Sequence, residues 1–338
     1  MTPRVVLYGA AGHTGRFIAA QMARRGWDAV LSGRDLAKLD PVAACYHAEA
    51  RQADLLRPAE ITDLVAGAAA IINAAGPFGD TSPYLIEAAL RAGIPYFDVT
   101  AEPFVAKEIF ETYDERAQRA HLIVAPAFGF FGALGDLLVT AAKGDWERAD
   151  NVELAFALDR WRPTNGTRLA GARRAGRRLV LTGGRMEVHD PARAVPRSRW
   201  TFGPPFGEQP TIGEFSTVDV VTIARHLSVE SISTWINEAP IADLSSSDPS
   251  GPEAADESGR STQQFAIEAV VRLGREQRRA SVSGRDIYAI TAPIVCEAVS
   301  WALAGRAMTT GVATAGELFP AADFLAALSP EPLSIQLH

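Results

Sequence analysis

The sequence contains little cysteine, little lysine and no long uninterrupted hydrophobic run. Its two cysteines, Cys45 and Cys296, lie far apart without a Cys-x-x-Cys motif, which argues against a disulfide framework or a zinc site and favours a reducing compartment. The apolar stretch LIVAPAFGFFGALG at 122–135 is broken by Pro126 and by glycines, and Asp136 follows it. We therefore read it as a strand, a loop and the start of a helix, and expect no membrane span.

Positive charge does not exceed negative charge, since the formal net charge is −7 at pH 7. This balance argues against nucleic acid as the default partner. The 338 residues, 47% hydrophobic and 22% charged, are enough for two globular domains with a sizeable core. A strand is expected within three residues of Met1, so we expect no signal peptide and a cytoplasmic location.

The N-terminal part of the chain alternates short apolar strands with amphipathic helices. This alternation predicts βαβ units and a doubly wound, Rossmann-type parallel sheet, which binds ligands at the carboxyl ends of its strands. The expected strands are Arg4–Tyr8, Ala29–Leu31, Tyr46–Ala50, Ala70–Asn73, Tyr96–Val99 and Leu122–Ala125, and the expected helices are Thr14–Arg25, Leu36–Ala43, Pro58–Ala66, Pro83–Ala92 and Phe104–Arg119.

After Asp150 the alternation of strands and helices gives way to a series of strand candidates. NVELAFAL, SVESISTWIN, QFAIEAVVRL and EQRRASVSG are strand candidates, and RLVLTGGRMEVH predicts a hairpin around Gly183–Gly184. We expect a second α+β domain on a mostly antiparallel or mixed sheet. The Ser-, Pro- and acid-rich segment 245–261 predicts a mobile surface loop, and ITAPIVCEAVSWALAG at 290–305 predicts a helix.

A glycine-rich loop, GAAGHTGR, joins the first strand to the first helix. Its GxxGxxG spacing allows a sharp turn and a close approach of backbone N–H groups and the helix dipole to a pyrophosphate. The alternative is an ordinary helix start at a glycine turn. His13 lies at the pyrophosphate end, so we expect it to pack near the cofactor rather than to catalyse. The residues assigned to the cofactor here are Gly9, Ala11, Gly12, His13, Thr14 and Gly15.

The end of the second strand, LSGRD, bears on the choice of cofactor. An NAD site usually places an acid here, whereas Arg34, with Ser32 beside it, could bind a 2′-phosphate by charge-assisted hydrogen bonds. We assign Asp35 to the N-cap of the next helix. The sequence therefore favours NADP (NADPH) over NAD, the alternative being that Arg34 is a solvated surface residue. Asp54, at the end of the third strand, could lie near the adenine.

The fourth strand ends in INAAGPF. Ala75, Gly76, Pro77 and Phe78 could form a tight turn near the nicotinamide ribose, or an ordinary βα turn.

Four motifs together resemble the saccharopine dehydrogenase-like family, and in particular its small bacterial members that include trans-acting enoyl reductases. They are GAAGHTGR, SGR, NAAGPFGDTSPYLIEAALRAGIPYFDVTAE and GRDIYAITAPIVCEAVSWAL. The resemblance implies an NADP-binding Rossmann domain at 1–130, a second domain at 131–285 with a mobile loop at 243–261, and a C-terminal helix and tail at 286–338 that return to the Rossmann domain. It also implies hydride transfer to or from a C=N or C=C bond, a role for Arg34 at the 2′-phosphate, and a nicotinamide-side turn at 76–78. It does not carry over to the substrate pocket.

The candidate catalytic residues follow from elimination and position. None of the six tyrosines has a lysine four residues on, and Lys38, Lys107 and Lys143 are the only lysines, so a Tyr-x-x-x-Lys mechanism and a lysine Schiff base are excluded. Near the ends of the strands remain Tyr84, Thr100 and Glu102. Glu102 could be a general acid or could belong to the N-cap region of the next helix. His226 could be a catalyst or a packed core residue.

Eleven arginines lie within residues 160–199. Arg160 and Arg162, which follow a predicted strand beside Trp161, could anchor a substrate carboxylate or phosphate. Alternatively they belong to a solvated basic face.

From these observations the sequence predicts an NADP-dependent oxidoreductase, a reductase that delivers hydride to a C=N or activated C=C bond of a small metabolite. We expect a homodimer, with no metal site and with neither nucleic acid nor a membrane as partner. The alternative is a non-catalytic NADP(H)-binding sensor or regulatory protein, because no proton donor stands out.

Overall fold

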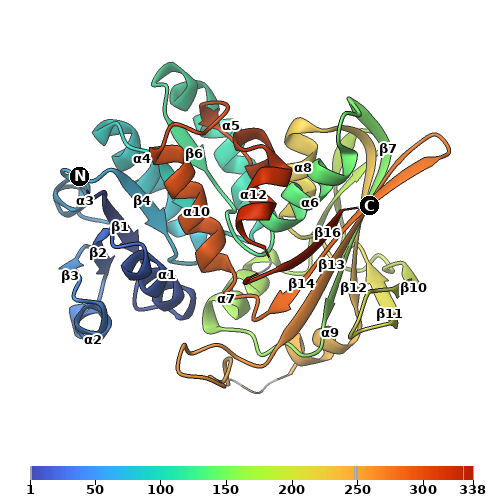
Figure 1. Cartoon of the computed structure of the whole chain (residues 1–338), viewed down its shortest axis with the longest axis horizontal. Helices are drawn as coiled ribbons and strands as arrows, with labels where there is room; N and C mark the ends of the chain where they lie inside the picture. Colours follow the sequence, from blue (N-terminus) through green and yellow to red (C-terminus); the bar gives the residue numbers. More distant parts are fainter. Residues whose placement is uncertain (1, 247, 249, 330, 338) are drawn as a thin grey trace.

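Two β-sheets form the framework of the molecule in the computed structural model, which describes residues 2–246, 248, 250–329 and 331–337 (Figure 1). The first sheet has seven strands, all parallel, in the order β15-β6-β5-β4-β1-β2-β3. Its strands are β1 (Arg4–Tyr8), β2 (Asp28–Gly33), β3 (Glu49–Gln52), β4 (Ala70–Asn73), β5 (Tyr96–Asp98), β6 (Ile123–Ala125) and β15 (Gly311–Val312).

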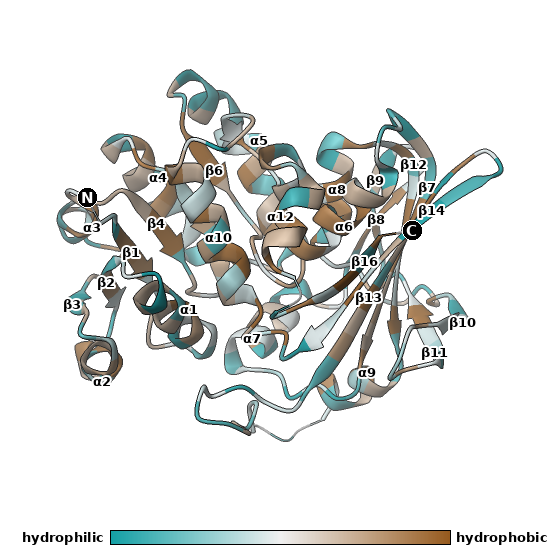
Figure 2. Ribbon diagram, in the orientation of Figure 1, coloured by the Kyte–Doolittle hydropathy of each residue, from teal (hydrophilic) through white to brown (hydrophobic). Residues whose placement is uncertain are grey.

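Helices cover both faces of this sheet, as the alternating pattern predicted. Val5 and Leu7 of β1 pack into one hydrophobic cluster while Val6 and Tyr8 pack into another on the opposite face, and all four are buried. Figure 2 shows β1 and β4 as predominantly hydrophobic strands. The helices of this part are α1 (His13–Arg24), α2 (Leu36–Tyr46), α3 (Pro58–Val65), α4 (Ser82–Ala92) and α5 (Pro103–Arg119).

The doubly wound parallel sheet is thereby confirmed, with one local error at the third strand. The expected strand at 46–50 was placed too early, because Tyr46 is the last residue of α2 and β3 begins at Glu49. His47, at φ 51°, ends the helix in the left-handed region.

The second sheet is mixed. Its main path runs β10-β11-β12-β7-β13-β14-β16, with the β8–β9 hairpin attached to β12, and only the β7–β12 pair is parallel. This confirms the expected α+β character and the hairpin at Gly183–Gly184. The strands are β7 (Arg148–Leu158), β8 (Arg178–Thr182), β9 (Arg185–His189), β10 (Arg197–Thr201), β11 (Glu208–Gly213), β12 (Ser228–Asn237), β13 (Gln264–Leu273), β14 (Glu276–Arg285) and β16 (Ser334–Leu337).

The remaining helices are η1 (Phe78–Asp80), α6 (Ala133–Lys143), α7 (Asn165–Arg174), α8 (Asp219–His226), α9 (Ala239–Leu244), α10 (Thr291–Leu303), α11 (Ala315–Leu318) and α12 (Ala321–Ala327). They include α6, α8, α11 and α12, which pack against one another between the two sheets (Figure 1). Across the described residues, every helix is too short or too polar to cross a membrane.

The loop predicted at 245–261 begins directly after α9, whereas the wider range of 243–261 includes the last two residues of that helix. Its described residues after the helix form neither helix nor strand, and positions 247 and 249 lie outside the described residues.

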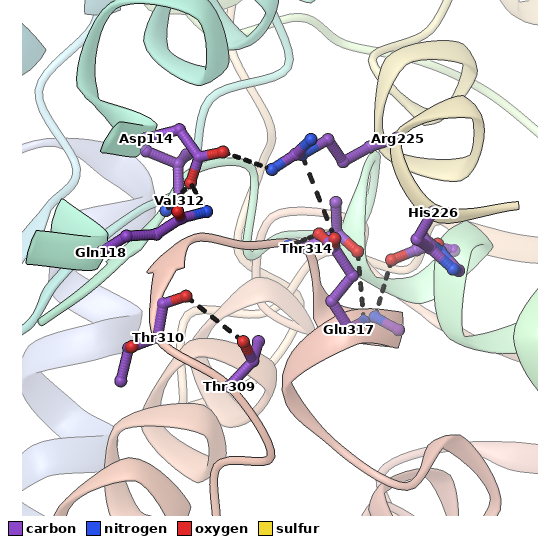
Figure 3. Close-up of polar contacts among 11 residues, drawn as sticks. Asp114, Gln118, Arg225, His226, Thr309, Thr310, Val312, Thr314 and Glu317 are labelled. Carbon is purple, nitrogen blue, oxygen red and sulfur yellow. Dashed lines mark hydrogen bonds and ion pairs between the residues drawn. The ribbon is translucent and has the colours of Figure 1, made fainter. Parts of the chain in front are cut away.

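The C-terminal part of the chain completes the parallel sheet. β15 pairs with β6 at the sheet edge, and α10 packs on α1, where Arg25 forms an ion pair with Glu297 (2.6 Å). A polar cluster joins β15 and α11 to α5, α6 and α8 (Figure 3). The domain boundaries at 130 and 285 stay predictions. The segment after residue 285 contributes β15 to the parallel sheet and β16 to the mixed sheet.

Two buried or partly buried carboxylates organise this cluster. Asp114 of α5 accepts hydrogen bonds from the Val312 N–H (3.0 Å) and from Arg225 (2.6 Å). The buried Asp136 of α6 bonds to His226 (2.6 Å) and to the Gly316 N–H (2.7 Å). His226 therefore joins helices together, which favours the packing interpretation over the catalytic one.

The turn between β1 and α1 is packed so closely that two of its glycines cannot carry a side chain. A Cβ atom on Gly15 would lie 2.2 Å from the backbone oxygen of Gly9, and one on Gly9 (φ +88°) would lie 2.7 Å from the backbone nitrogen of Ala75. These contacts hold the start of α1 against the ends of β1 and β4. At Gly12 the nearest atom would be 3.2 Å away.

We predict that Gly15→Ala disrupts this turn while Gly12→Ala largely preserves it. The contact at Gly15 is with backbone, which can move only by separating α1 from β1, whereas Gly12 has an ordinary φ of −69°. Chemical denaturation should show Gly15→Ala destabilised by about 2 kcal/mol or more, or not folded, and Gly12→Ala by less than about 1 kcal/mol. Equal stability of the two variants would contradict this packing.

Two buried carboxyl groups fix the loop from Ala127 to Gly132, which leads from the parallel sheet to α6. Asp98 accepts hydrogen bonds from the Ala127 N–H (2.9 Å) and from the Tyr96 hydroxyl (2.8 Å). Asp219 accepts from the Gly132 N–H (3.0 Å). Burial raises the pKa of Asp98 to about 6 and the pKa of Asp219 to about 7.

We predict that Asp219→Asn makes the protein less sensitive to rising pH. With a native pKa near 7 and a normal unfolded pKa, the folded state binds the extra proton between about pH 4 and 7. The stability associated with Asp219 is therefore complete at low pH and decreases as pH rises through that window. The free energy of unfolding of the variant, minus that of the parent, should increase between pH 5 and 7 by roughly 1 kcal/mol per pH unit.

Urea titrations across this pH range measure the difference. Asp63→Asn, which removes an exposed carboxyl on α3, is the matched control and should leave the slope unchanged. A difference that stays flat for Asp219→Asn would show that this carboxyl is ionised throughout the window.

Candidate functional site

A cavity of about 790 Å³ lies between the carboxyl edge of the parallel sheet and the second sheet. The turns after β1, β2 and β4 line one side of it, and α7 with the loop at 127–132 lines the other. This is the position at which the strand order of the parallel sheet reverses, from β1-β2-β3 on one side to β4-β5-β6 on the other.

The glycine-rich loop forms one wall of this cavity. Gly9, Ala11, Gly12, His13 and Thr14 line it, while Gly15 lies behind them against the Gly9 oxygen. α1 begins here with Gly12 as N-cap, with no side-chain cap and no acid in its first turn. The N-terminal N–H groups and the positive end of the helix dipole are therefore available to an anion.

Two polar atoms beside this loop are buried without a hydrogen-bond partner among the described residues, namely His13 Nε2 and Ser32 Oγ. The His13 ring packs edge-on against Phe17 and Tyr288, with ring centres 5.2 and 5.3 Å away. Burial lowers the pKa of His13, which keeps the imidazole neutral at pH 7. Both residues line the cavity, so a bound molecule could satisfy them.

Charged side chains follow β2 along the same wall. Arg34 lines the cavity, is exposed, and has no ion-pair partner in the described part of the chain. Asp35 caps α2 by accepting from the Lys38 N–H (3.3 Å), as predicted, and its carboxylate pairs with the Lys38 ammonium (3.1 Å). Lys38 also lines the cavity and was not predicted as a site residue; its spacing of three from the N-cap Asp35 is the signal that could have indicated it.

Asp54, assigned to the adenine side, does not line the cavity. Its carboxylate accepts from the Leu56 N–H (3.0 Å) and so closes the turn that precedes α3. No residue of β3 lines the cavity, so the polar side chains at this end are Ser32, Arg34, Asp35 and Lys38.

The turn after β4 and Glu102, the residue before α5, both line the cavity and contact each other. Ala75, Gly76 and Phe78 line the wall, whereas Pro77 does not. Glu102 accepts a hydrogen bond from the Phe78 N–H (2.8 Å), and burial raises the pKa of its carboxyl. Although Glu102 occupies the N-cap position of α5, its side chain does not cap that helix. It is free to face the cavity instead.

The other two predicted catalytic residues lie elsewhere. Thr100, which follows β5, is completely buried, and its hydroxyl accepts a hydrogen bond from the Glu102 N–H (3.1 Å). Tyr84 is 40% exposed on the outer side of α4. Neither lines the cavity, so among the three candidates the geometry brings only Glu102 to it.

Arg160 and Arg162 also lie outside the main cavity. They line a separate pocket of about 70 Å³ near the surface, where Arg162 pairs with Glu253 and Arg160 lies 3.4 Å from Asp159. Within the arginine-rich stretch, the residues that line the main cavity are Arg173, Arg174 and Arg177, on and just after α7. They belong to the same arginine-rich stretch, and only the position of α7 distinguishes them.

Aromatic side chains form the wall opposite the glycine-rich loop. Trp161 packs near Phe131 and Phe215, with ring centres 5.9 and 6.2 Å away, and Phe130 packs against Phe131 at 4.8 Å. All four line the cavity. Trp161 was expected to lie beside a pocket, whereas Phe130, Phe131 and Phe215 were not predicted, because these residues come from three segments that meet only in the folded chain.

Tyr288 links the two walls. Its hydroxyl oxygen accepts from Trp161 Nε1 (3.0 Å) and from the Thr164 N–H (3.2 Å), and it shares a hydrogen bond with the Thr167 hydroxyl (3.0 Å). With its ring against His13, Tyr288 sets the distance between the glycine-rich loop and the start of α7.

Comparisons with known proteins agree with this arrangement. Residues 9–128 match a family model described as NAD(P)H-binding. A Mycobacterium tuberculosis protein named as a candidate trans-acting enoyl reductase is 31% identical over 150 residues, which are 41% of this chain and 36% of that protein. The trans-acting enoyl reductase of Mycobacterium ulcerans is 28% identical over 173 residues, or 46% of this chain and 41% of that protein. The chain thus spans less than half the length of these relatives.

The similarity of fold extends over the whole chain. Saccharopine dehydrogenase (L-Glu forming) from Saccharomyces cerevisiae superposes with a TM-score of 0.67 at 11% identity, covering 99% of this chain and 100% of that one. The predicted NAD(P)-binding domain and fold class are therefore confirmed. The chain shares the fold of saccharopine dehydrogenase, and its N-terminal part is similar to NAD(P)H-binding proteins and to trans-acting enoyl reductases.

Proposed function

We propose that this protein is an NADP-dependent reductase that delivers hydride to a C=N or activated C=C bond of a small metabolite. The observation that carries the proposal is the cavity of about 790 Å³, in which a helix start suited to an anion and an unpaired Arg34 face the same space as an aromatic wall and a half-buried carboxyl. The oxidoreductase names of the relatives support the same reaction class.

The residues present fit a dinucleotide with a 2′-phosphate. The Gly9–Gly15 loop would hold the pyrophosphate, because its backbone approaches closely and no side chain intervenes. Ser32, Arg34 and Lys38 would hold the 2′-phosphate by charge-assisted hydrogen bonds. Asp35 is neutralised by Lys38, so it presents less repulsion to that phosphate than a free carboxylate would. When bound, the nicotinamide ring supplies the hydride.

The chain's own contribution would be to exclude water and to supply a proton. The aromatic wall replaces water along one side of the cavity. Glu102 holds its proton to a higher pH than an exposed glutamate does, because burial raises its pKa, and the Phe78 N–H fixes the position of its Oε1. We therefore assign the proton-donor role to Glu102.

The alternative of a non-catalytic NADP(H) sensor retains some support, since Thr100 and Tyr84 point away from the cavity. The cytoplasmic location and the homodimer stay predictions.

Binding and turnover together test the proposal. We expect NADPH to raise the melting temperature of the purified protein in a thermal-shift assay, because a ligand that binds only the folded state stabilises it. A cyclic imine, an enone and a keto acid offered with an amine should then be screened for loss of NADPH absorbance. Turnover of one of these classes is the expected result. NADPH binding without turnover would favour the sensor, and no NADPH binding would reject both.

We predict that Arg34→Ala changes the cofactor preference. The variant should bind NADPH about tenfold more weakly while NADH binding changes by less than about threefold, because only NADPH carries the 2′-phosphate. Fluorescence titration with each cofactor measures both constants. Arg16→Ala, which removes an exposed arginine of α1, is the control and should leave the ratio unchanged. An equal loss for both cofactors in Arg34→Ala would refute this assignment.

A further inference from the structure

Arg174, the last residue of α7, brings a positive charge to the cavity without an acidic partner. Its Nη1 donates to the backbone oxygen of Ser216 (3.1 Å), and its other nitrogens have no hydrogen-bond partner among the described residues. No carboxylate within the described residues lies at ion-pair distance from it. Arg174 is partly buried, and it lines the cavity.

The other cations on this side of the cavity are already engaged. Arg173 forms a two-pronged ion pair with Asp80 (2.6 and 2.8 Å), and Arg177 lies over the ring of Phe104 at 4.6 Å. Both contacts anchor α7 to the parallel-sheet side of the cavity. Among these three, Arg174 is the one that the described residues give neither a carboxylate partner nor an aromatic ring against its guanidinium.

An unpaired guanidinium that is shielded from water is unfavourable unless something binds it. Burial and the neighbouring Arg178 lower the pKa of Arg174, which shows that its charge is poorly solvated. The Glu102 carboxyl also lines the cavity, but it accepts from the Phe78 N–H and forms no ion pair with Arg174 among the described residues. The structure thus supplies a cation and leaves its counter-ion to a ligand.

The segment that accepts the hydrogen bond from Arg174 also carries an aromatic residue of the cavity wall. Its hydrogen-bond acceptor, Ser216, follows Phe215 directly, and Phe215 packs with Phe131 and Trp161 on the aromatic wall. Arg174 lines the same cavity as these aromatic side chains, so one ligand of suitable length can meet both. A strongly hydrated, fully polar ligand would not satisfy this environment.

We propose that the substrate is an amphipathic carboxylic acid, whose carboxylate binds Arg174 and whose apolar part lies against Phe131, Trp161 and Phe215. The proposal rests on the reductase function and adds to it the chemical class of the substrate. Nη1 and Nη2 at the end of a guanidinium present parallel N–H donors that match the two oxygens of a carboxylate. One unpaired guanidinium at this position matches a ligand that brings one carboxylate to it.

Matched acid and amide probes test this binding site. We expect trans-cinnamate and hexanoate to bind the NADP⁺-saturated protein in isothermal titration, and trans-cinnamamide and hexanamide to bind at least about tenfold more weakly. Arg174→Gln should reduce the affinity for both acids by about tenfold or more, bring acid and amide close together, and leave NADP⁺ affinity unchanged. Arg174→Lys keeps the positive charge but loses the paired N–H donors of the guanidinium, so it should retain part of the preference for acids.

Arg162→Gln is the matched control, because it removes an equal charge from an arginine outside the cavity. It should leave acid binding intact. Equal affinity for acid and amide in the parent protein, undiminished acid binding in Arg174→Gln, or an equal loss in Arg162→Gln would overturn the proposal. Circular dichroism of each variant shows whether the fold is kept, and Arg174→Lys provides the test if Arg174→Gln does not fold.

The reductase function and the anion site at Arg174 can be rejected separately. Loss of NADP⁺ binding in the parent protein would reject the reductase function, whereas selective acid binding to the cofactor-free protein through Arg174 would still support the anion site. NADP⁺ binding without acid binding would reject the anion site alone.

Discussion

The close approach of backbone to backbone at Gly9 and Gly15 is the constraint on which the rest of this structure depends. The Gly9 oxygen lies where a Cβ of Gly15 would be, and Ala75 lies where a Cβ of Gly9 would be. This contact brings the start of α1 to the carboxyl edge of the sheet and leaves its N–H groups facing open space. The anion-binding end of the cavity exists because no side chain separates these segments.

The second half of the cavity depends on buried carboxyls rather than on glycine. Asp98 holds the beginning of the 127–132 loop and Asp219 holds its end. That loop carries Phe130 and Phe131 into the cavity, so the position of the aromatic wall is fixed by hydrogen bonds to groups with raised pKa values. The stability of this wall and its dependence on pH are therefore linked.

Charge is distributed unevenly along the cavity. At the β2 end Asp35 accompanies Lys38 but leaves Arg34 unpaired, and at the α7 end Asp80 accompanies Arg173 but leaves Arg174 unpaired. Between them lie the glycine-rich loop and the half-buried Glu102. A cavity with an unpaired cation at each end suits an occupant that carries anionic groups at both ends, which is what a 2′-phosphorylated dinucleotide and an acidic substrate would provide together.

Local patterns in the sequence determined the parallel sheet, its helices, the glycine-rich loop and the cap at Asp35, because each depends on neighbours within a few residues. The same patterns indicated that Glu102, Thr100 and Tyr84 follow strand ends, but not which of them turns toward the cavity. Only the tertiary structure decided that, since Thr100 bonds inward to the next turn and Tyr84 lies on the outer side of α4.

Which arginines of 160–199 line the cavity likewise depends on the tertiary structure. All eleven look alike in sequence, yet α7 lies across the cavity and brings Arg174 into it, while Arg160 and Arg162 stay near the surface. The aromatic wall is assembled from residues near 130, 161 and 215, separated by long stretches of chain. The sequence by itself determined the glycine-rich turn at the start of α1, because that turn depends on contiguous residues, whereas the tertiary structure decided which aromatic and arginine side chains line the cavity, because that wall is made by segments that meet only after folding.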